Sequence, residues 1–397
     1  MDEASDSASY PLIPAPWFPK NLVNQEAHPS TFGEGLVTPW GRLYGWDFTP
    51  ALLPSWWQSA PEGWWGVWPG AIKRVECVAQ NRSGLVLNLD DRWTAYLYPF
   101  PTGKEVSSLS LYSPWKAALE RSSVFLAKGG LVNEHGDAVA LFEHHTCISA
   151  NLLYRRAIEL SETLGEVHSV LVDHQTPNTE RRWNDGLKSI EDVLKTNTLW
   201  RAPHTKNVVG LPSFHISLDG CVALFRWLHI IPQPRPLVNH LLSLSDRTPG
   251  LAEMAMLEQR LALAGVFATT EERETFYRYW ADKVPPSWSA KSTLSIVNGG
   301  VWIWRYQAML LLLAEARAFG LDEQARLCEQ WLFDVSRIQA RLSELRVLIA
   351  IMKGSIVASL LTALLASSPL KWPVVGGALL CALGAKLLAK KREPPAF

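Results

Sequence analysis

The chain has 397 residues, of which 48% are hydrophobic and 19% are charged, so it is long and apolar enough for two or three globular domains and does not resemble a disordered chain. Lys+Arg and Asp+Glu both number 38, and this balance argues against nucleic acid as a partner. The five cysteines are scattered without a CxxC pair, which argues against a disulfide framework and a zinc ribbon. The acidic, polar N-terminus lacks the pattern of a secretion signal, so we expect a reducing cytoplasm.

Tryptophan is unusually frequent, with 19 residues in the chain, and many of them fall in a region rich in Pro and Gly. Because proline removes backbone donors and restricts the residue before it, we expect residues 1–70 to be an extended segment that packs on a following sheet. Trp56, Trp57, Trp64 and Trp65 are candidates for a surface that binds a partner protein. The same side chains could instead pin a loop onto the sheet, or stack on a sugar.

The middle of the chain changes from strand patterns to helical patterns. Residues 71–175 contain β-rich runs at 75–79, 84–89 and 93–100, separated by polar turn residues, and predict an antiparallel β-rich domain with a helix. Residues 176–346 show helical spacing of apolar residues, with Thr269 and Glu272 in a capping-box pattern, and predict a helical domain. The predicted fold class is therefore α+β, with a Trp-rich antiparallel β domain before a helical domain.

Two apolar runs near the C-terminus, residues 347–366 and 374–389, are separated by a Pro-containing break. Twenty helical residues span about 30 Å, the thickness of a bilayer's hydrocarbon core. We therefore predict a transmembrane helical hairpin over residues 347–389 and a basic cytoplasmic tail over 390–397. Basic residues flank the open end of the hairpin, so the positive-inside rule places both termini in the cytoplasm, at a bacterial inner membrane. The alternative is a hydrophobic hairpin inside a soluble core.

Two further patterns concern how these helices pack. Small residues recur every four positions, and in lipid such faces allow helices to pack closely; the residues are Gly354, Ala358, Thr362 and Ala366 in one run and Gly377, Cys381 and Ala385 in the other. Upstream, apolar residues from Cys328 to Ile349 follow heptad spacing. That spacing predicts either a homodimer through this helix or packing on a helix of the same chain.

Sequence motifs for catalysis are largely missing: the chain has no GxSxG, HExxH, GxGxxG or P-loop pattern. The densest ionisable region extends from His135 and Asp137 through His144, His145 and Cys147 to His174, and it could supply a metal site or an acid–base pair. However, adjacent histidines on a strand point to opposite faces. We therefore predict no catalytic residue, no cofactor and no metal ligand.

The leading hypothesis for function is a non-enzymatic, membrane-tethered adaptor or immunity-type protein. It would bind another protein on the cytoplasmic side, in a bacterial envelope or secretion system. One alternative is a membrane-active, pore-forming effector that uses the C-terminal hairpin. A second alternative is an enzyme with an unrecognised site between His135 and His174.

Overall fold

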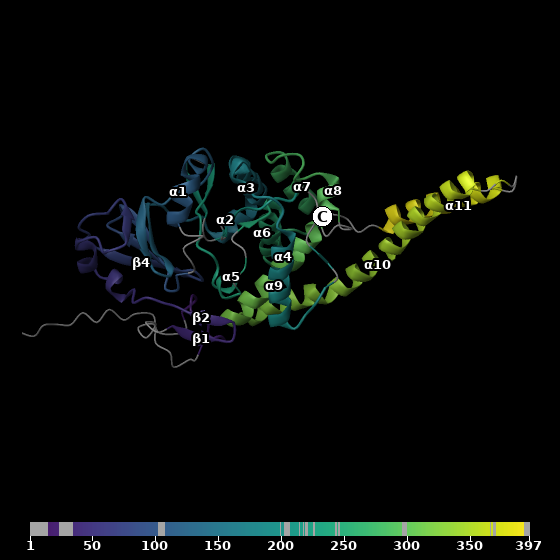
Figure 1. The fold of residues 1–397 in the computed structure, drawn as a ribbon. Coiled ribbons are helices and arrows are strands. Elements are labelled where there is room, and N and C mark those ends of the chain that lie inside the picture. The colour runs from purple at the N-terminus through teal and green to yellow at the C-terminus, as the bar shows by residue number, and fades with distance from the viewer. Residues whose placement is uncertain are drawn as a thin grey trace, which may run out of the picture.

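The computed structural model describes residues 15–392 except 24–34, 102–107, 199, 202–206, 214, 217, 219–220, 225–226, 243, 245–246, 296–299, 366 and 368–370. An N-terminal lobe is built on an antiparallel sheet, a C-terminal lobe is helical, and two long helices project from the helical lobe (Figure 1). The predicted α+β class, with a β lobe before a helical lobe, is confirmed.

The sheet lobe has six antiparallel strands in the order β3-β7-β8-β6-β5-β4. The strands are β3 (Trp64–Gly66), β4 (Val75–Asn81), β5 (Gly84–Leu89), β6 (Trp93–Leu97), β7 (Gly129–Asn133) and β8 (Gly136–Glu143). Helix α1 (Ser108–Leu119) connects β6 to β7, and a separate hairpin joins β1 (Leu36–Thr38) to β2 (Gly41–Leu43). Every residue of β5 is buried, so this strand lies inside the lobe and both of its faces are covered.

The helical lobe follows, with short strand pairs between its helices. Its helices are α2 (Ala150–Arg155), α3 (Ala157–Val170), α4 (Glu180–Leu194), α5 (Leu237–Leu241), α6 (Gly250–Leu263), α7 (Thr270–Ala281), α8 (Lys291–Leu294) and α9 (Gly300–Phe319). The pairs are β10 (Cys221–Leu224) with β11 (Trp227–Ile230), and β9 (Leu211–Pro212) with β12 (Arg247–Thr248). The predicted capping box at Thr269 and Glu272 is confirmed, because each side chain bonds to the other residue's backbone N–H at the start of α7.

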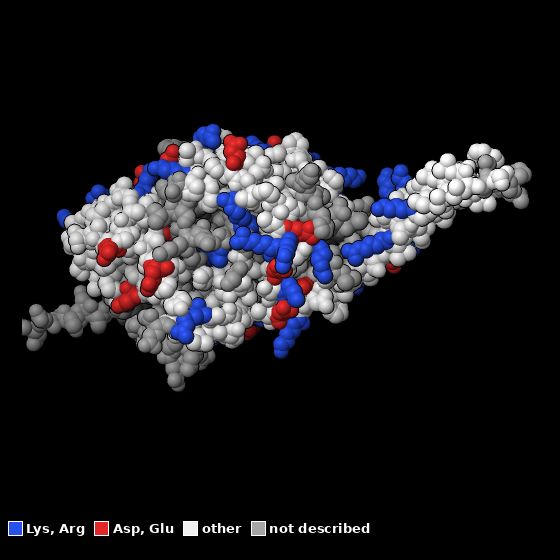
Figure 2. Space-filling model, viewed as in Figure 1, with Lys and Arg blue, Asp and Glu red and all other residues white. Residues whose placement is uncertain are grey.

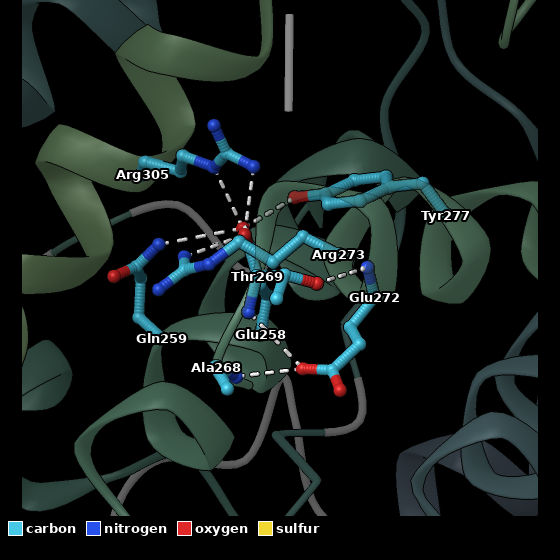
Figure 3. Close-up of polar contacts among 8 residues, drawn as sticks. All are labelled: Glu258, Gln259, Ala268, Thr269, Glu272, Arg273, Tyr277 and Arg305. Atoms are coloured by element: carbon cyan, nitrogen blue, oxygen red, sulfur yellow. Dashed lines mark hydrogen bonds and ion pairs between the residues drawn. The ribbon is translucent and has the colours of Figure 1, made fainter. Parts of the chain in front are cut away.

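A buried charge cluster joins three helices of this lobe (Figure 3). The Glu258 carboxylate on α6 is fully buried and accepts two hydrogen bonds of 2.7 Å from Arg305 on α9. Tyr277 and Arg273 on α7 each donate one more at 2.9 Å. Burial raises the pKa of Glu258, but the charges of Arg305 and Arg273 outweigh it and bring that pKa below its ordinary value. The cluster fixes α6, α7 and α9 to one another.

The projecting helices are α10 (Asp322–Leu365) and α11 (Lys371–Arg392), and both are long and apolar enough to cross a membrane. They lie antiparallel: Ser359 donates to the Val375 carbonyl at 3.2 Å, and Arg392 pairs with Glu344 at 2.7 Å. Uncharged side chains cover most of the projecting part and lysines and arginines gather at its root (Figure 2). Most large apolar side chains beyond residue 346 are exposed, as they would be in a helix pair that faces lipid.

The contact between α10 and α11 includes only part of the small-residue pattern. Ser359, Ala382 and Ala385 are buried there and Thr362 is half-buried. Other members of the pattern are exposed, namely Gly354, Ala358, Gly377 and Cys381, and Ala366 lies outside the described residues. Most of the heptad positions from Cys328 to Ile349 are covered within the chain: Cys328, Val335 and Leu342 are buried and Ile349 is half-buried. The homodimer through this helix stays a prediction.

Candidate functional site

The ionisable residues that the sequence singled out are spread over the molecule. His135 lies in the turn between β7 and β8 and stacks on Tyr44, which directly follows β2; the two ring centroids are 4.2 Å apart. His144 is exposed at the other end of β8, and His168 is buried on α3. Within the part of the chain that the structure describes, no three His, Cys, Asp or Glu residues are placed to hold a metal ion.

One small cluster of that region does form at the end of β8. The Tyr96 hydroxyl lies 3.1 Å from His145 Nε2 and 3.2 Å from Cys147 Sγ. The other ring nitrogen of His145 lies 2.9 Å from the Glu143 carbonyl, so this nitrogen carries the proton and Nε2 accepts from Tyr96. Burial lowers the pKa of His145, which keeps the imidazole neutral.

Three of the four candidate tryptophans pack together with Trp68. Trp57 is fully buried and stacks on Trp68 with centroids 5.7 Å apart, and its indole N–H donates to the Ala51 carbonyl at 2.9 Å. Trp56 and Trp64 pack edge-on against Trp57. Trp65 is half-buried on the other side of β3, against a separate group of apolar side chains. The partner surface proposed for these residues stays a prediction.

A cavity of about 540 Å³ lies where the two lobes meet. We call it the interlobe cleft. The sheet lobe contributes the turn between β4 and β5 and the chain just after β6, and the helical lobe contributes α6, α9 and the start of α10. The polar and charged side chains around it are those of Arg82, Tyr98, His215, Gln233, Arg235, Arg260, Glu315, Glu323 and Gln324.

Arginines from both lobes meet at one carboxylate in this cleft. Arg82 donates to Glu315 at 2.9 Å and to Gln324 at 2.8 Å, while Arg260 reaches the other Glu315 oxygen at 3.4 Å. Burial raises the pKa of Glu315, but the charges of Arg260 and Arg82 outweigh it and hold that pKa below its ordinary value. Arg235 adds a third guanidinium to the lining, so the cleft suits an anionic group.

Three buried polar groups line the same cleft without a hydrogen-bond partner among the described residues: the Tyr98 hydroxyl, the Gln233 carbonyl oxygen and the Trp17 indole N–H. Tyr98 is 1% exposed, and burial raises the pKa of its hydroxyl, so it is a neutral donor. A buried polar group without a partner is costly, and such groups are usually satisfied by bound water or a ligand. Their position makes the cleft a candidate binding site.

A smaller cavity of about 80 Å³ continues from the cleft and shares Arg260 and Glu315 with it. Glu253 lines this inner cavity and accepts from Ser213 at 2.6 Å and from His168 at 2.7 Å. Trp280 donates to the other nitrogen of His168 at 2.9 Å, so the proton of this ring is on the nitrogen that faces Glu253. The sequence analysis missed this arrangement because its members come from α3, α6, α7 and the residue after β9, which are far apart in the sequence.

No family model matches the sequence, and no curated protein matches it. Solved structures do show a similar chain path. A glucosamine kinase is 10% identical, with 75% of this chain and 85% of that chain covered and a TM-score of 0.47. An aminoglycoside phosphotransferase bound to GDP and kanamycin is 10% identical, with 67% and 94% covered and a TM-score of 0.41. A choline kinase from Streptococcus pneumoniae is 11% identical, with 65% and 91% covered and a TM-score of 0.37.

These similar structures are small-molecule kinases and phosphotransferases, which contradicts the prediction of a non-enzymatic adaptor or immunity-type protein. The prediction was wrong because the similarity lies in the path of the whole chain, at identities of 10–11%, and the short patterns that the sequence analysis looked for do not record that path. Identities of 10–11% and TM-scores below 0.5 transfer neither a substrate nor a catalytic residue to this chain.

A metal ion in the cleft would need carboxylates or histidines as ligands, and no three His, Cys, Asp or Glu side chains of the described residues are placed to hold one. The buried Glu315 is already paired with two arginines. We therefore derive no step through a metal ion.

Proposed function

We propose that the two-lobed body is an enzyme that binds a small phosphorylated molecule in the interlobe cleft. One observation carries the proposal: arginines of both lobes, Arg82 and Arg260, converge in a cavity of about 540 Å³. Guanidinium groups pair with phosphate through two parallel hydrogen bonds, and the volume is typical of small-molecule sites. The neutral Tyr98 hydroxyl and the Gln233 amide would orient the uncharged part of the ligand.

Phosphoryl transfer is the reaction class that we propose. A P–O bond of the donor breaks while a new P–O bond forms to an acceptor oxygen, whose proton leaves to a base or to water. The charge on the transferring group would be neutralised by Arg82 and Arg260, as guanidinium groups do in other phosphotransferases. Removing either guanidinium should therefore lower both binding and turnover.

Binding of inorganic pyrophosphate and of ATP to the full chain in detergent, with and without Mg²⁺, tests the proposal by calorimetry. Arg82→Met keeps the approximate length of the side chain and removes the guanidinium that we propose pairs with the phosphate, so we expect affinity for either anion to fall about 10- to 100-fold. The matched control is Arg181→Met, because Arg181 lies on α4 with its side chain 96% exposed. The proposal fails if neither anion binds, or if Arg82→Met binds as tightly as the control.

We further propose that α10 and α11 cross a bacterial inner membrane as a hairpin with both termini in the cytoplasm. This finer assignment is supported by the distribution of charge. Arg346 and Lys353 on α10, and Lys386 and Lys390 on α11, lie toward the same end of the helix pair and are exposed. Their long side chains can reach the headgroups of the cytoplasmic leaflet.

Cysteine labelling of intact cells tests this topology, in a background where the exposed Cys77 and Cys381 are replaced by Ser and Ala. Ser367→Cys should react with a membrane-impermeant thiol reagent from outside, and Lys390→Cys only after lysis. The reverse pattern would show the opposite orientation. Labelling of neither before lysis would exclude a crossing hairpin whose turn is exposed.

A further inference from the structure

We infer that the ligand of the interlobe cleft is a water-soluble molecule and not a lipid of the membrane, because α10 holds the cleft far above the bilayer. This inference rests on the proposed function and narrows its substrate class. It also rests on the proposed membrane hairpin, because the helix that lines the cleft continues into that hairpin.

The length of helix α10 fixes the distance between the cleft and the membrane hairpin. Its first turns contribute Glu323, Gln324 and Leu327 to the lining of the cleft, and the helix continues without a break to Leu365. The apolar part begins at Val347, 20 residues after Leu327, and this length of helix is about 30 Å. A tilt of up to roughly 40° would still leave a height of about 23 Å.

The helix between these two points cannot sink into the bilayer. It carries exposed charged side chains along its length, at Asp334, Arg337, Arg341, Glu344 and Arg346. Arg392, at the end of α11, pairs with Glu344 at 2.7 Å, so the two helices are joined by charge at the level where the apolar part begins. This level marks the position of the membrane surface.

The arrangement of the lobes agrees with this distance. The helical lobe lies between the sheet lobe and the projecting hairpin (Figure 1). The cleft lies where the lobes meet, with Arg82 from the sheet lobe on one side and Arg260 from the helical lobe on the other. A phospholipid would have to leave the bilayer, with its acyl chains in water, before its phosphate could reach either arginine.

Energy transfer in nanodiscs tests the distance independently of any ligand. Two variants each carry one donor dye: Ser83→Cys carries it beside the cleft, and Ser343→Cys carries it on α10 close to the apolar part. The acceptor dye is on the lipid headgroups. In both variants Cys77, Cys147 and Cys381 are replaced by Ser or Ala. We expect efficient transfer from position 343 and much weaker transfer from position 83. Equal transfer from both positions would overturn the inference.

A matched pair of phosphates tests the substrate class. Glycerol 3-phosphate is soluble, and phosphatidic acid carries the same phosphate monoester on a lipid in the nanodisc. We expect soluble glycerol 3-phosphate to slow alkylation of Ser83→Cys several-fold and phosphatidic acid to leave it unchanged, whereas protection by phosphatidic acid would overturn the inference. If neither phosphate slows alkylation and pyrophosphate does not bind, the proposed phosphate site is wrong. The inference about its ligand is then wrong as well, even if energy transfer confirms the distance between the cleft and the membrane.

Discussion

Replacing Arg305 with Leu should be one of the most damaging single changes in the helical lobe. Arg305 is 2% exposed and donates two hydrogen bonds of 2.7 Å to Glu258, which is fully buried. Leucine would fill much of the space but leave the carboxylate with only Arg273, Tyr277 and the longer bond of 3.3 Å from Gln259. The variant therefore tests whether this ion pair is needed because the charge of Glu258 is buried.

The expected loss can be worked from these contacts. Two charge-assisted hydrogen bonds, at about 1.5–3 kcal/mol each, amount to about 3–6 kcal/mol. Arg273 still donates to Glu258 from a side chain that is 26% exposed, and this compensates in part. We expect the free energy of unfolding to fall by about 3–5 kcal/mol, the usual result of removing one partner of a buried pair.

The loss should depend on pH in a defined direction. The pKa of Glu258 is lowered in the folded protein from its ordinary 4.5, so the stability that ionised Glu258 contributes is complete above 4.5 and disappears as the pH falls through the lower folded value. Protonation removes the charge that Arg305 neutralises. The difference between Arg305→Leu and the wild-type protein should therefore be larger at pH 7 than at about pH 4.

Urea unfolding of the full chain in detergent, followed by tryptophan fluorescence, measures the change. The control is the double variant Glu258→Leu and Arg305→Leu, which removes the buried charge together with its partner and should cost less than Arg305→Leu alone. A loss below about 1 kcal/mol in the single variant, or a larger loss in the double variant, would refute the reasoning.

Three further predictions concern other parts of the body. Trp57→Ala should lower the free energy of unfolding by about 3–5 kcal/mol, measured by urea unfolding, because the fully buried indole packs on three other tryptophans. The control is Trp372→Ala, which should leave the unfolding of the body unchanged because this side chain is exposed on α11. Cys77 should react with a thiol reagent in the native protein, whereas the buried Cys328 should react only after unfolding, as mass spectrometry of labelled peptides would show. Gly84→Ala should destabilise the sheet lobe by at least about 1–3 kcal/mol in the same unfolding assay, because its φ of +150° disfavours a side chain and a Cβ would lie 1.9 Å from the Leu97 carbonyl oxygen.

Much of the local structure could be predicted because its causes are local. The runs at 75–79 and 84–89 correspond to β4 and β5, since strand-favouring composition and the polar turn between the runs act over a few residues. Thr269 and Glu272 cap α7 through bonds within one helical turn. The two apolar C-terminal runs are likewise visible in α10 and α11, because length and hydropathy are properties of the sequence alone.

The candidate site depended on tertiary structure. Arg82, Arg260 and Glu315 are separated by 178 and 55 residues along the chain and meet only because the β4–β5 turn folds over α6 and α9. His168 and Glu253 are 85 residues apart, and no spacing rule predicts their contact. The charged residues that the sequence does bring close together, from His135 to Cys147, lie at opposite ends of β8, because an eight-residue strand separates its two ends by about 25 Å. Sequence alone therefore determined the elements and the apolar hairpin, whereas the convergence of charge in the cleft was decided by how the two lobes pack.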